Sequence, residues 1–449
     1  MLWTAASASN ASSLLVSPTS DVLSEPVRVR IQGVQPGAEV IVRASFRDHQ
    51  DSPWNAEARF FADAHGAVDT DADVSLGGTY TGTGAGQLLC SALPVAIRDL
   101  SAHKASLGNS ARPLISPVLV DISYINIEVS ASVVGAKPLV ATVRRGYAHD
   151  GVVANEVSTA EVVGVYYAPP PNVAQRQAVL VIGGSGGGVS WQQAALLASH
   201  GHPALAIAYF GYKDLPPALV DIPLERFSAG VQWLRAKTKS SQVAVVGTSR
   251  GSEAAQLLAV HFPEGVAQVV LISPAHLGHG GFGNDVGAAR AAWTLRGQSV
   301  PFVRFAGDAT ASDETAFREQ GKMPPGFVGT PSFLPFWNSD RAAADWGIPV
   351  ERANARFLVL AGTADTMWPS WIAADRIAAR VSSRRRADLV RVVTYPGAGH
   401  AISRVAFANA MSDFTLHPVT KSFASVGGLP AANCAAGFDV WKQILAFIS

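Results

Sequence analysis

The chain has 449 residues, of which 48% are hydrophobic and 15% charged, and its formal net charge is +1. This length allows two or three domains. An almost neutral chain gives no electrostatic reason to expect nucleic acid or an anionic membrane as a partner. Its apolar runs are each under ten residues, whereas about 20 are needed to cross a bilayer. We therefore expect no membrane span.

The two cysteines, Cys90 and Cys434, lie far apart and show neither a CxxC motif nor metal-ligand spacing. The first 18 residues lack the basic start and the apolar core of a secretory signal. We therefore expect two reduced thiols, a cytoplasmic location and no metal site.

Residues 1–140 are predicted to form a β-sandwich. Between about residues 13 and 140, short stretches with alternating apolar residues, such as "VRVRIQGV" at 27–34, are separated by turn signals such as "QPGAE". This stretch shows no long amphipathic helix pattern. Short strands at such spacing are typical of two packed antiparallel sheets.

Residues 141–449 are predicted to form an α/β domain. Fully apolar strands such as "AVLVIGG" at 178–184 alternate here with helical segments such as "LERFSAGVQWLRAKT" at 224–238. Strands of this kind, separated by helices, indicate a mostly parallel sheet that is covered on both faces.

A long segment without a clear strand pattern interrupts this alternation. It is rich in Gly, Phe, Pro and Trp, and we assign residues 276–345 to a cap or lid insertion, because so long a stretch is rarely a plain connection. Its apolar part, "GTPSFLPFW" at 329–337, is expected either to line an acyl pocket or to belong to an ordinary core.

The stretch "VVGTSRGSEAAQLLA" at 245–259 places Ser249 between an apolar strand and a helix. A serine becomes nucleophilic when its position is fixed and a neighbouring base takes its proton. The G-x-S-x-G elbow fixes the position at a tight strand-to-helix corner, where Gly247 and Gly251 allow the backbones to approach. Ser249 is therefore the candidate nucleophile. Ser252 is assigned to the first turn of the helix.

In an α/β-hydrolase the acid and then the histidine follow the serine along the chain. Asp365 comes directly after the strand "RFLVLAG", and His400 lies in the glycine loop after "VRVVTYP". We predict that Ser249 attacks a carbonyl, that His400 moves the proton and that Asp365 orients the imidazole. Asp375, within a helix, and Asp308, within the cap, are weaker alternatives for the acid. His261 is assigned to the end of the elbow helix.

The oxyanion of the reaction needs two preorganised donors. The backbone N–H of Arg250, which follows the nucleophile, is one candidate. The other is expected from the "GGSGGG" loop at 183–188, at Gly184 or Ser185. The alternative, a phosphate-binding loop, is disfavoured because the stretch lacks both the Lys-Ser/Thr of a P-loop and the dinucleotide fingerprint.

Several stretches together resemble the acyl-CoA thioester hydrolase / bile acid-CoA:amino acid N-acyltransferase family. They are "LAIAYFGYKDLP", "GTSRGSE", "WGIPVERANARFLVLAGTADTMWPS", "YPGAGHAI" and, in the front half, "GGTYTGTGAGQLL". The resemblance implies an N-terminal immunoglobulin-like β-sandwich, a C-terminal α/β-hydrolase domain and a role in lipid metabolism. It places the family's nucleophile, acid and base on Ser249, Asp365 and His400. Coenzyme A would enter as part of the substrate, with no other cofactor.

The chain departs from the family's pattern at several positions. Members specialised for transfer to glycine or taurine tend to carry Cys where this chain has Ser249, so the resemblance favours water as the acceptor. The oxyanion loop is "GGSGGG" rather than a Gly-Pro-Gly-like sequence, and Cys90 stands where a Trp is commoner. Basic residues that could grip the coenzyme's phosphates are few, namely Arg250, Lys213 and the run 384–386.

Three functions remain open from the sequence. The first is an acyl-CoA thioesterase that works through an acyl-enzyme on Ser249. The second is an esterase or acyltransferase that uses the same triad on oxygen esters, amine acceptors or a natural-product acyl chain. The third, a non-catalytic binding protein on the same fold, is disfavoured because binding alone requires none of the three triad residues.

Overall fold

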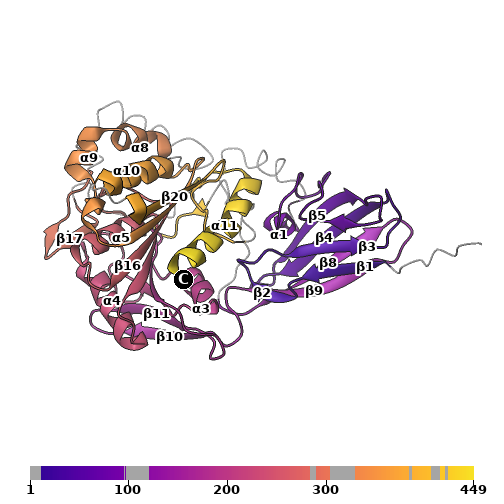
Figure 1. Cartoon of the computed structure of the whole chain (residues 1–449), viewed down its shortest axis with the longest axis horizontal. Helices are drawn as coiled ribbons and strands as arrows, with labels where there is room; N and C mark the ends of the chain where they lie inside the picture. Colours follow the sequence, from indigo (N-terminus) through magenta and orange to yellow (C-terminus); the bar gives the residue numbers. More distant parts are fainter. Residues whose placement is uncertain are drawn as a thin grey trace, which may run out of the picture.

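The computed structural model describes residues 12–95, 97, 121–283, 290–303, 329–383, 387–405, 415–419 and 423–449. The chain folds into a β-rich front domain and a larger α/β domain, which lie beside each other in Figure 1. Among these described residues no helix is long and apolar enough to cross a membrane. The same residues contain no group of acidic, His or Cys side chains that could hold a metal ion.

Two sheets make up the front domain. The larger contains, in spatial order, β2 (Ser20–Val22), β9 (Leu139–Gly146), β8 (Ile125–Val133), β4 (Glu39–Arg47), β5 (Pro53–Phe61) and β7 (Leu93–Pro94). The smaller contains β1 (Ser13–Ser17), β3 (Arg28–Gln32) and β6 (Val68–Asp69). Side chains along β4 alternate between buried and more exposed, and its buried residues share one core with Val29 and Ile31 of β3. The expected β-sandwich is confirmed.

The expected domain boundary, between residues 140 and 141, lies inside a strand of this sandwich. β9 pairs with β8 along its length, from Ile125↔Arg145 to Ala131↔Leu139. The front domain therefore extends to Gly146, and the α/β sheet begins with β10 at Val153. The expected boundary is therefore placed too early, because the last strand of the sandwich continues beyond residue 140.

An eight-stranded sheet forms the centre of the second domain. Its order is β10 (Val153–Ser158), β11 (Val163–Ala168), β13 (Ala204–Ala208), β12 (Ala178–Ile182), β15 (Val243–Thr248), β16 (Val266–Ile272), β19 (Arg356–Gly362) and β20 (Val390–Tyr395). The strands from β13 to β20 are parallel, while β10 and β11 are antiparallel additions at one edge. The parallel sheet predicted from the apolar strands is confirmed.

Helices cover both faces of this sheet. Val179 and Val181 of β12 share a core with α3 (Trp191–Ser199) and α11 (Pro430–Ile448). Leu180 and Ile182 point to the opposite face, which is covered by α4 (Glu225–Thr238), α5 (Arg250–His261) and α10 (Ser370–Ser383). Figure 1 shows α11 between the sheet and the front domain. The first core also includes the front sandwich, so α11 belongs to the junction of the two domains.

The segment between β16 and β19 contains the region that was expected to be a cap. Its described elements are β17 (Trp293–Leu295), β18 (Gln298–Ser299), α8 (Thr330–Trp337), α9 (Asp340–Trp346) and the short η1 (Val350–Arg352). β17 pairs with β14 (Ile222–Pro223), and α8 with α9 forms a small apolar cluster. The remaining short elements of the chain are α1 (Gln87–Cys90), η2 (Ala387–Leu389), β21 (Thr415–Leu416) and β22 (Phe423–Ala424). Asp308 lies outside the described residues.

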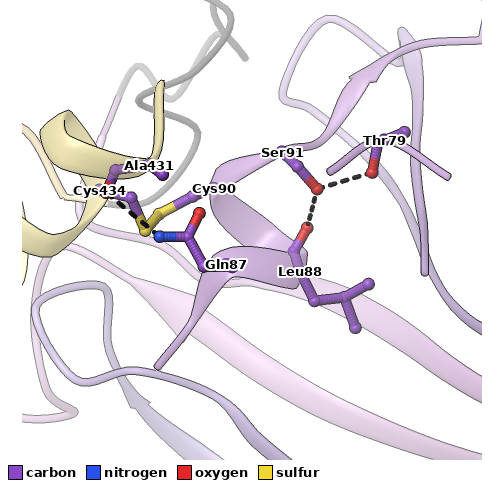
Figure 2. The surroundings of a disulfide bond; sticks show 7 residues. All are labelled: Thr79, Gln87, Leu88, Cys90, Ser91, Ala431 and Cys434. Carbon is purple, nitrogen blue, oxygen red and sulfur yellow. Dashed lines mark hydrogen bonds between the residues drawn. A yellow bond between two sulfur atoms is a disulfide. The ribbon is translucent and has the colours of Figure 1, made fainter. Parts of the chain in front are cut away.

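The expectation of two reduced thiols is wrong, because Cys90 and Cys434 form a disulfide (Figure 2). Cys90 ends α1 in the front domain, and Cys434 lies in the first turns of α11, with the two Cα atoms 5.9 Å apart. Their separation of 344 positions conceals this proximity in the sequence. The expected cytoplasmic location rested on reduced thiols and loses that support, since disulfides persist mainly in oxidising compartments.

Candidate active site

Ser249 occupies the corner between β15 and α5 with φ 54° and ψ −123°. A non-glycine residue rarely has positive φ, and such strain at a strand-to-helix corner is the signature of a nucleophile elbow. The corner requires both flanking glycines. A Cβ at Gly247 would overlap Gly251 O and the Ala255 side chain, and a Cβ at Gly251 would overlap the carbonyl oxygens of Ile182 and Gly183.

The structure brings Ser249, His400 and Asp365 together. Ser249 Oγ lies 3.0 Å from His400 Nε2, and His400 Nδ1 lies 2.8 Å from Asp365 Oδ2. Asp365 follows β19 and His400 follows β20, so the carboxyl ends of parallel strands deliver them to the same edge as the elbow. Asp375 lies within α10 and His261 is the last residue of α5, as expected.

Asp365 is buried, with 1% of its surface exposed. Both of its carboxylate oxygens accept hydrogen bonds, Oδ2 facing His400 as described above. Oδ1 accepts hydrogen bonds from the backbone N–H groups of Met367, at 2.9 Å, and Trp368, at 3.3 Å. These bonds fix the carboxylate, so that Oδ2 faces Nδ1 of His400. The imidazole then presents Nε2 to the Ser249 hydroxyl, which is the arrangement a general base requires.

The expected oxyanion loop lies directly beside the elbow. A Cβ built on Gly184 would be 3.1 Å from Ser249 Cβ, so the backbone of Gly184 lies close to the nucleophile. Tyr209 donates its hydroxyl to Gly183 O, at 2.6 Å, and to Gly184 O, at 3.1 Å, which holds the loop in place. The backbone N–H of Arg250 begins α5, where N–H groups have no partner within the helix.

Ser185 faces a histidine that sequence reasoning did not single out. Its hydroxyl oxygen lies 3.0 Å from Nε2 of His417, whose side chain is buried. His417 comes from the segment 415–419, far from the loop in sequence, so no local pattern could have paired them. This contact orients the Ser185 side chain toward His417.

The side chain of Arg250 does not reach out toward a substrate phosphate. It is buried against Glu253, with Arg250 Nε 2.7 Å from Glu253 Oε1, and it donates to the carbonyl oxygens of His279 and Gly280 at 3.1 and 3.0 Å. Lys213 pairs with Glu156 at 2.8 Å, and residues 384–386 lie outside the described chain. The suggestion that Arg250 grips coenzyme A phosphates is therefore wrong, since its guanidinium is already engaged inside the protein.

Glu253, which the sequence analysis missed, is fully buried behind the elbow. Burial pushes its pKa up, but the charge of Arg250 together with His279 and Trp293 lowers the pKa of Glu253 overall. Its oxygens accept from His279 Nδ1 at 3.0 Å and from Trp293 Nε1 at 2.8 Å. The available signal was an acidic residue inside the otherwise apolar helix "SEAAQLLAV".

An apolar pocket of about 190 Å³ opens beside Ser249 and His400. Its walls include Phe282, Phe333, Met367 and Trp368. The stretch 329–337 was expected either to line a pocket or to belong to an ordinary core, and it does both. Phe333 lines the pocket, while Phe336 and Trp337 are buried in an apolar cluster. The pocket is larger than the 150 Å³ engineered cavity that holds benzene, so it can take a small apolar acyl group.

The parallel sheet with its serine elbow defines an enzyme of the α/β-hydrolase class. Within this class the chain belongs to the acyl-CoA thioester hydrolase/BAAT family. The family's N-terminal region matches residues 24–159, and its C-terminal region matches residues 335–449. The family resemblance noted from sequence motifs is thus confirmed at both ends of the chain.

Similarity to individual relatives extends over nearly the whole chain. Human acyl-coenzyme A thioesterase 1 is 28% identical over 433 residues, which is 94% of this chain and 92% of the relative. Human mitochondrial acyl-coenzyme A thioesterase 2 is 27% identical, over 94% of this chain and 80% of the relative. Rat acyl-coenzyme A amino acid N-acyltransferase 2 is 27% identical over 97% of this chain and 96% of the relative.

Proposed function

We propose that the chain hydrolyses acyl thioesters, with coenzyme A esters as the substrate class and Ser249 as the nucleophile. The observation that carries this proposal is the hydrogen-bonded series Ser249–His400–Asp365 at the mouth of an apolar pocket. The names of the thioesterase relatives support the choice of a thioester. The pocket would receive the acyl group, and the coenzyme would remain outside it.

The proposed reaction has two halves. Ser249 Oγ attacks the thioester carbonyl carbon while His400 Nε2 takes the hydroxyl proton, and Asp365 stabilises the imidazolium. Backbone N–H groups of Arg250 and of Gly184 or Ser185 would stabilise the oxyanion, and one such donor typically contributes about 3–4 kcal/mol. The intermediate expels the thiolate, which takes the proton from His400. A water molecule, deprotonated by His400, then attacks the acyl-enzyme carbonyl. The bond to Ser249 Oγ breaks, Oγ takes the proton back from His400, and the free acid is released.

A second candidate is transfer of the acyl group to an amine, or cleavage of an oxygen ester, on the same site. The similarity to an amino acid N-acyltransferase motivates it. It differs from hydrolysis only in the group that attacks the acyl-enzyme. Ser at position 249 supports water as the acceptor, because the family resemblance implies Cys there in members specialised for transfer.

The test measures thiol release from short-, medium- and long-chain acyl-CoA, and phenol release from p-nitrophenyl esters, with and without glycine or taurine. We expect thioester turnover that falls by roughly 10⁴-fold or more in Ser249→Ala. Ser252→Ala is the matched control, because its hydroxyl lies one helical turn away and accepts the Ala275 N–H. Turnover of oxygen esters alone, or product formation only with an amine, would replace the first candidate by the second.

A further inference from the structure

The position of His400 depends on a segment that is distant in sequence. His400 donates its backbone N–H to Val426 O at 2.6 Å, and the Leu429 N–H donates to Gly397 O at 2.8 Å. Bridges also pair Asp365 with Gly427 and Ala398 with Gly428. The loops of the acid and the histidine are thus aligned on residues 426–429, which lead directly into α11.

One buried side chain, that of Asn433, connects this segment to the residue before His400. Asn433 is 5% exposed. Its Oδ1 accepts the Gly399 N–H at 2.8 Å, and its Nδ2 donates to Gly427 O at 3.1 Å. A Cβ on Gly428 would overlap the same amide, so the group is tightly enclosed. A displacement of Asn433 would therefore release the backbone of Gly399, directly before His400, and that of Gly427, next to the residue that accepts the His400 N–H.

The first turns of α11, which carry Asn433, begin with Pro430, a residue suited to the first helical position, but have no side-chain cap. The N-cap residue Leu429 makes no side-chain capping bond, and uncapped helix ends fray. The front domain supplies the missing support. Cys434 is bonded to Cys90, and Gln87 Nε2 donates to Ala431 O at 3.2 Å (Figure 2). Both contacts come from α1, on the side of the helix that faces the sandwich.

We propose that Asn433 is a positioning residue for His400, and that the Cys90–Cys434 disulfide holds Asn433 in place. The front domain would thereby contribute to turnover without touching the substrate. This inference rests on the proposed function of the triad. A misplacement of about 1 Å in a catalytic group can cost about 10²-fold in rate, so a loosened first turn is enough to slow the reaction while all three triad residues remain present.

The bridge makes this support dependent on oxidation. Reduction adds two electrons and two protons to the disulfide and gives two thiols, while a dithiol reductant such as dithiothreitol becomes its cyclic disulfide. The enzyme is then expected to be most active in the oxidised form. That property would suit an oxidising compartment, where such bonds persist.

The first test compares Asn433→Ala with Asn433→Asp, which keeps an acceptor for the Gly399 N–H. We expect kcat to fall about 10- to 100-fold in Asn433→Ala, with KM within about twofold, and to recover partly in Asn433→Asp. Gln443→Ala is the matched control on the same helix, since Gln443 contacts Arg391 and Asp439 instead of the histidine loop. An unchanged kcat in Asn433→Ala, with only a lower Tm, would overturn the positioning role.

The second test is a double-mutant cycle between the bridge and Asn433. Cys90→Ala/Cys434→Ala is expected to lower kcat about tenfold, and Asn433→Ala is expected to add little in that background, because both changes release the same contact. Fully additive effects, or wild-type kcat without the bridge, would overturn the coupling. If the bridge-free variant does not fold, purified protein reduced with dithiothreitol takes its place.

A third readout separates this inference from the proposed function. A fluorophosphonate labels an activated serine and needs the Ser249–His400 pair but no thioester. If wild-type protein shows no thioester turnover, the proposed function fails, and the labelling rate still decides the role of Asn433. Slow labelling in Asn433→Ala, compared with Gln443→Ala, supports positioning, and equal rates overturn it.

Discussion

At the scale of single residues, the fully buried carboxylate of Glu253 holds three polar side chains together. It lies four residues after the nucleophile and forms an ion pair with Arg250. It also accepts hydrogen bonds from Trp293 Nε1 and His279 Nδ1. Trp337 Nε1 donates to His279 Nε2 at 3.2 Å, so the network assigns the imidazole hydrogen to Nδ1. One carboxylate thus joins the elbow helix to the walls of the pocket.

We predict that Glu253→Gln lowers the free energy of unfolding by about 3–5 kcal/mol, because it leaves the buried Arg250 charge without its partner. Urea unfolding at neutral pH measures this loss. Glu156→Gln is the matched control, since Glu156 pairs with Lys213 at the surface, where solvent screening leaves an ion pair with little effect on stability. Equal losses in the two variants would contradict the role assigned to Glu253.

At the scale of elements, the active site is built by close approach of β12, β15 and α5. Gly251 on α5 lies against the carbonyl oxygens of Ile182 and Gly183, at the end of β12. The strand that carries the oxyanion loop and the helix that follows Ser249 therefore touch through backbone atoms. This contact is what brings Gly184 over the nucleophile.

We predict that Gly251→Ala separates these elements and lowers both stability and turnover. Overpacking typically costs about 1–3 kcal/mol, and here the obstacle is backbone that cannot rotate away. Gly297→Ala is the control, because a Cβ there meets nothing within 4 Å and only its positive φ of 74° opposes the change. Turnover in Gly251→Ala equal to that in Gly297→Ala would show that the contact is dispensable.

At the scale of the whole molecule, buried histidines link stability to pH. Burial lowers the pKa of His276 to about 3 and that of His200 to about 4, from an ordinary value of 6.5. At a pH between the folded pKa and 6.5, the unfolded chain binds protons that the folded chain does not, so the free energy of unfolding falls as the pH falls. His149 has the opposite sign, because its hydrogen bond to Asp21 raises the pKa of His149, and its contribution is lost as pH rises through the folded value.

We predict that the free energy of unfolding decreases from pH 6.5 to pH 4, by up to about 1.4 kcal/mol per pH unit for each buried histidine. Urea midpoints at four pH values measure the slope. In His276→Phe, which keeps the edge-on packing against Trp337, the slope becomes shallower. A variant with the wild-type slope would contradict the assignment to His276.

The sequence alone determined the features that depend on near neighbours. Alternating apolar residues predicted the sandwich, and fully apolar strands separated by helices predicted the parallel sheet. The spacing of Gly247, Ser249 and Gly251 predicted the elbow, because strand, helix and tight corner are set within a few residues. The triad candidates followed from the order of strands, since the carboxyl ends of parallel strands meet at one edge. Residues 284–289 and 304–328 of the expected cap lie outside the described chain, so its complete form stays a prediction.

Only the tertiary structure decided the contacts between distant segments. Cys90 meets Cys434 because α11 packs between the sheet and the sandwich, and no spacing rule connects positions 344 residues apart. The pairing of Glu253 with His279 and that of Asn433 with Gly399 have the same origin. Each of these contacts forms only when the packing of the whole chain brings two distant segments within hydrogen-bond distance. Such proximity produces no periodic pattern in the sequence.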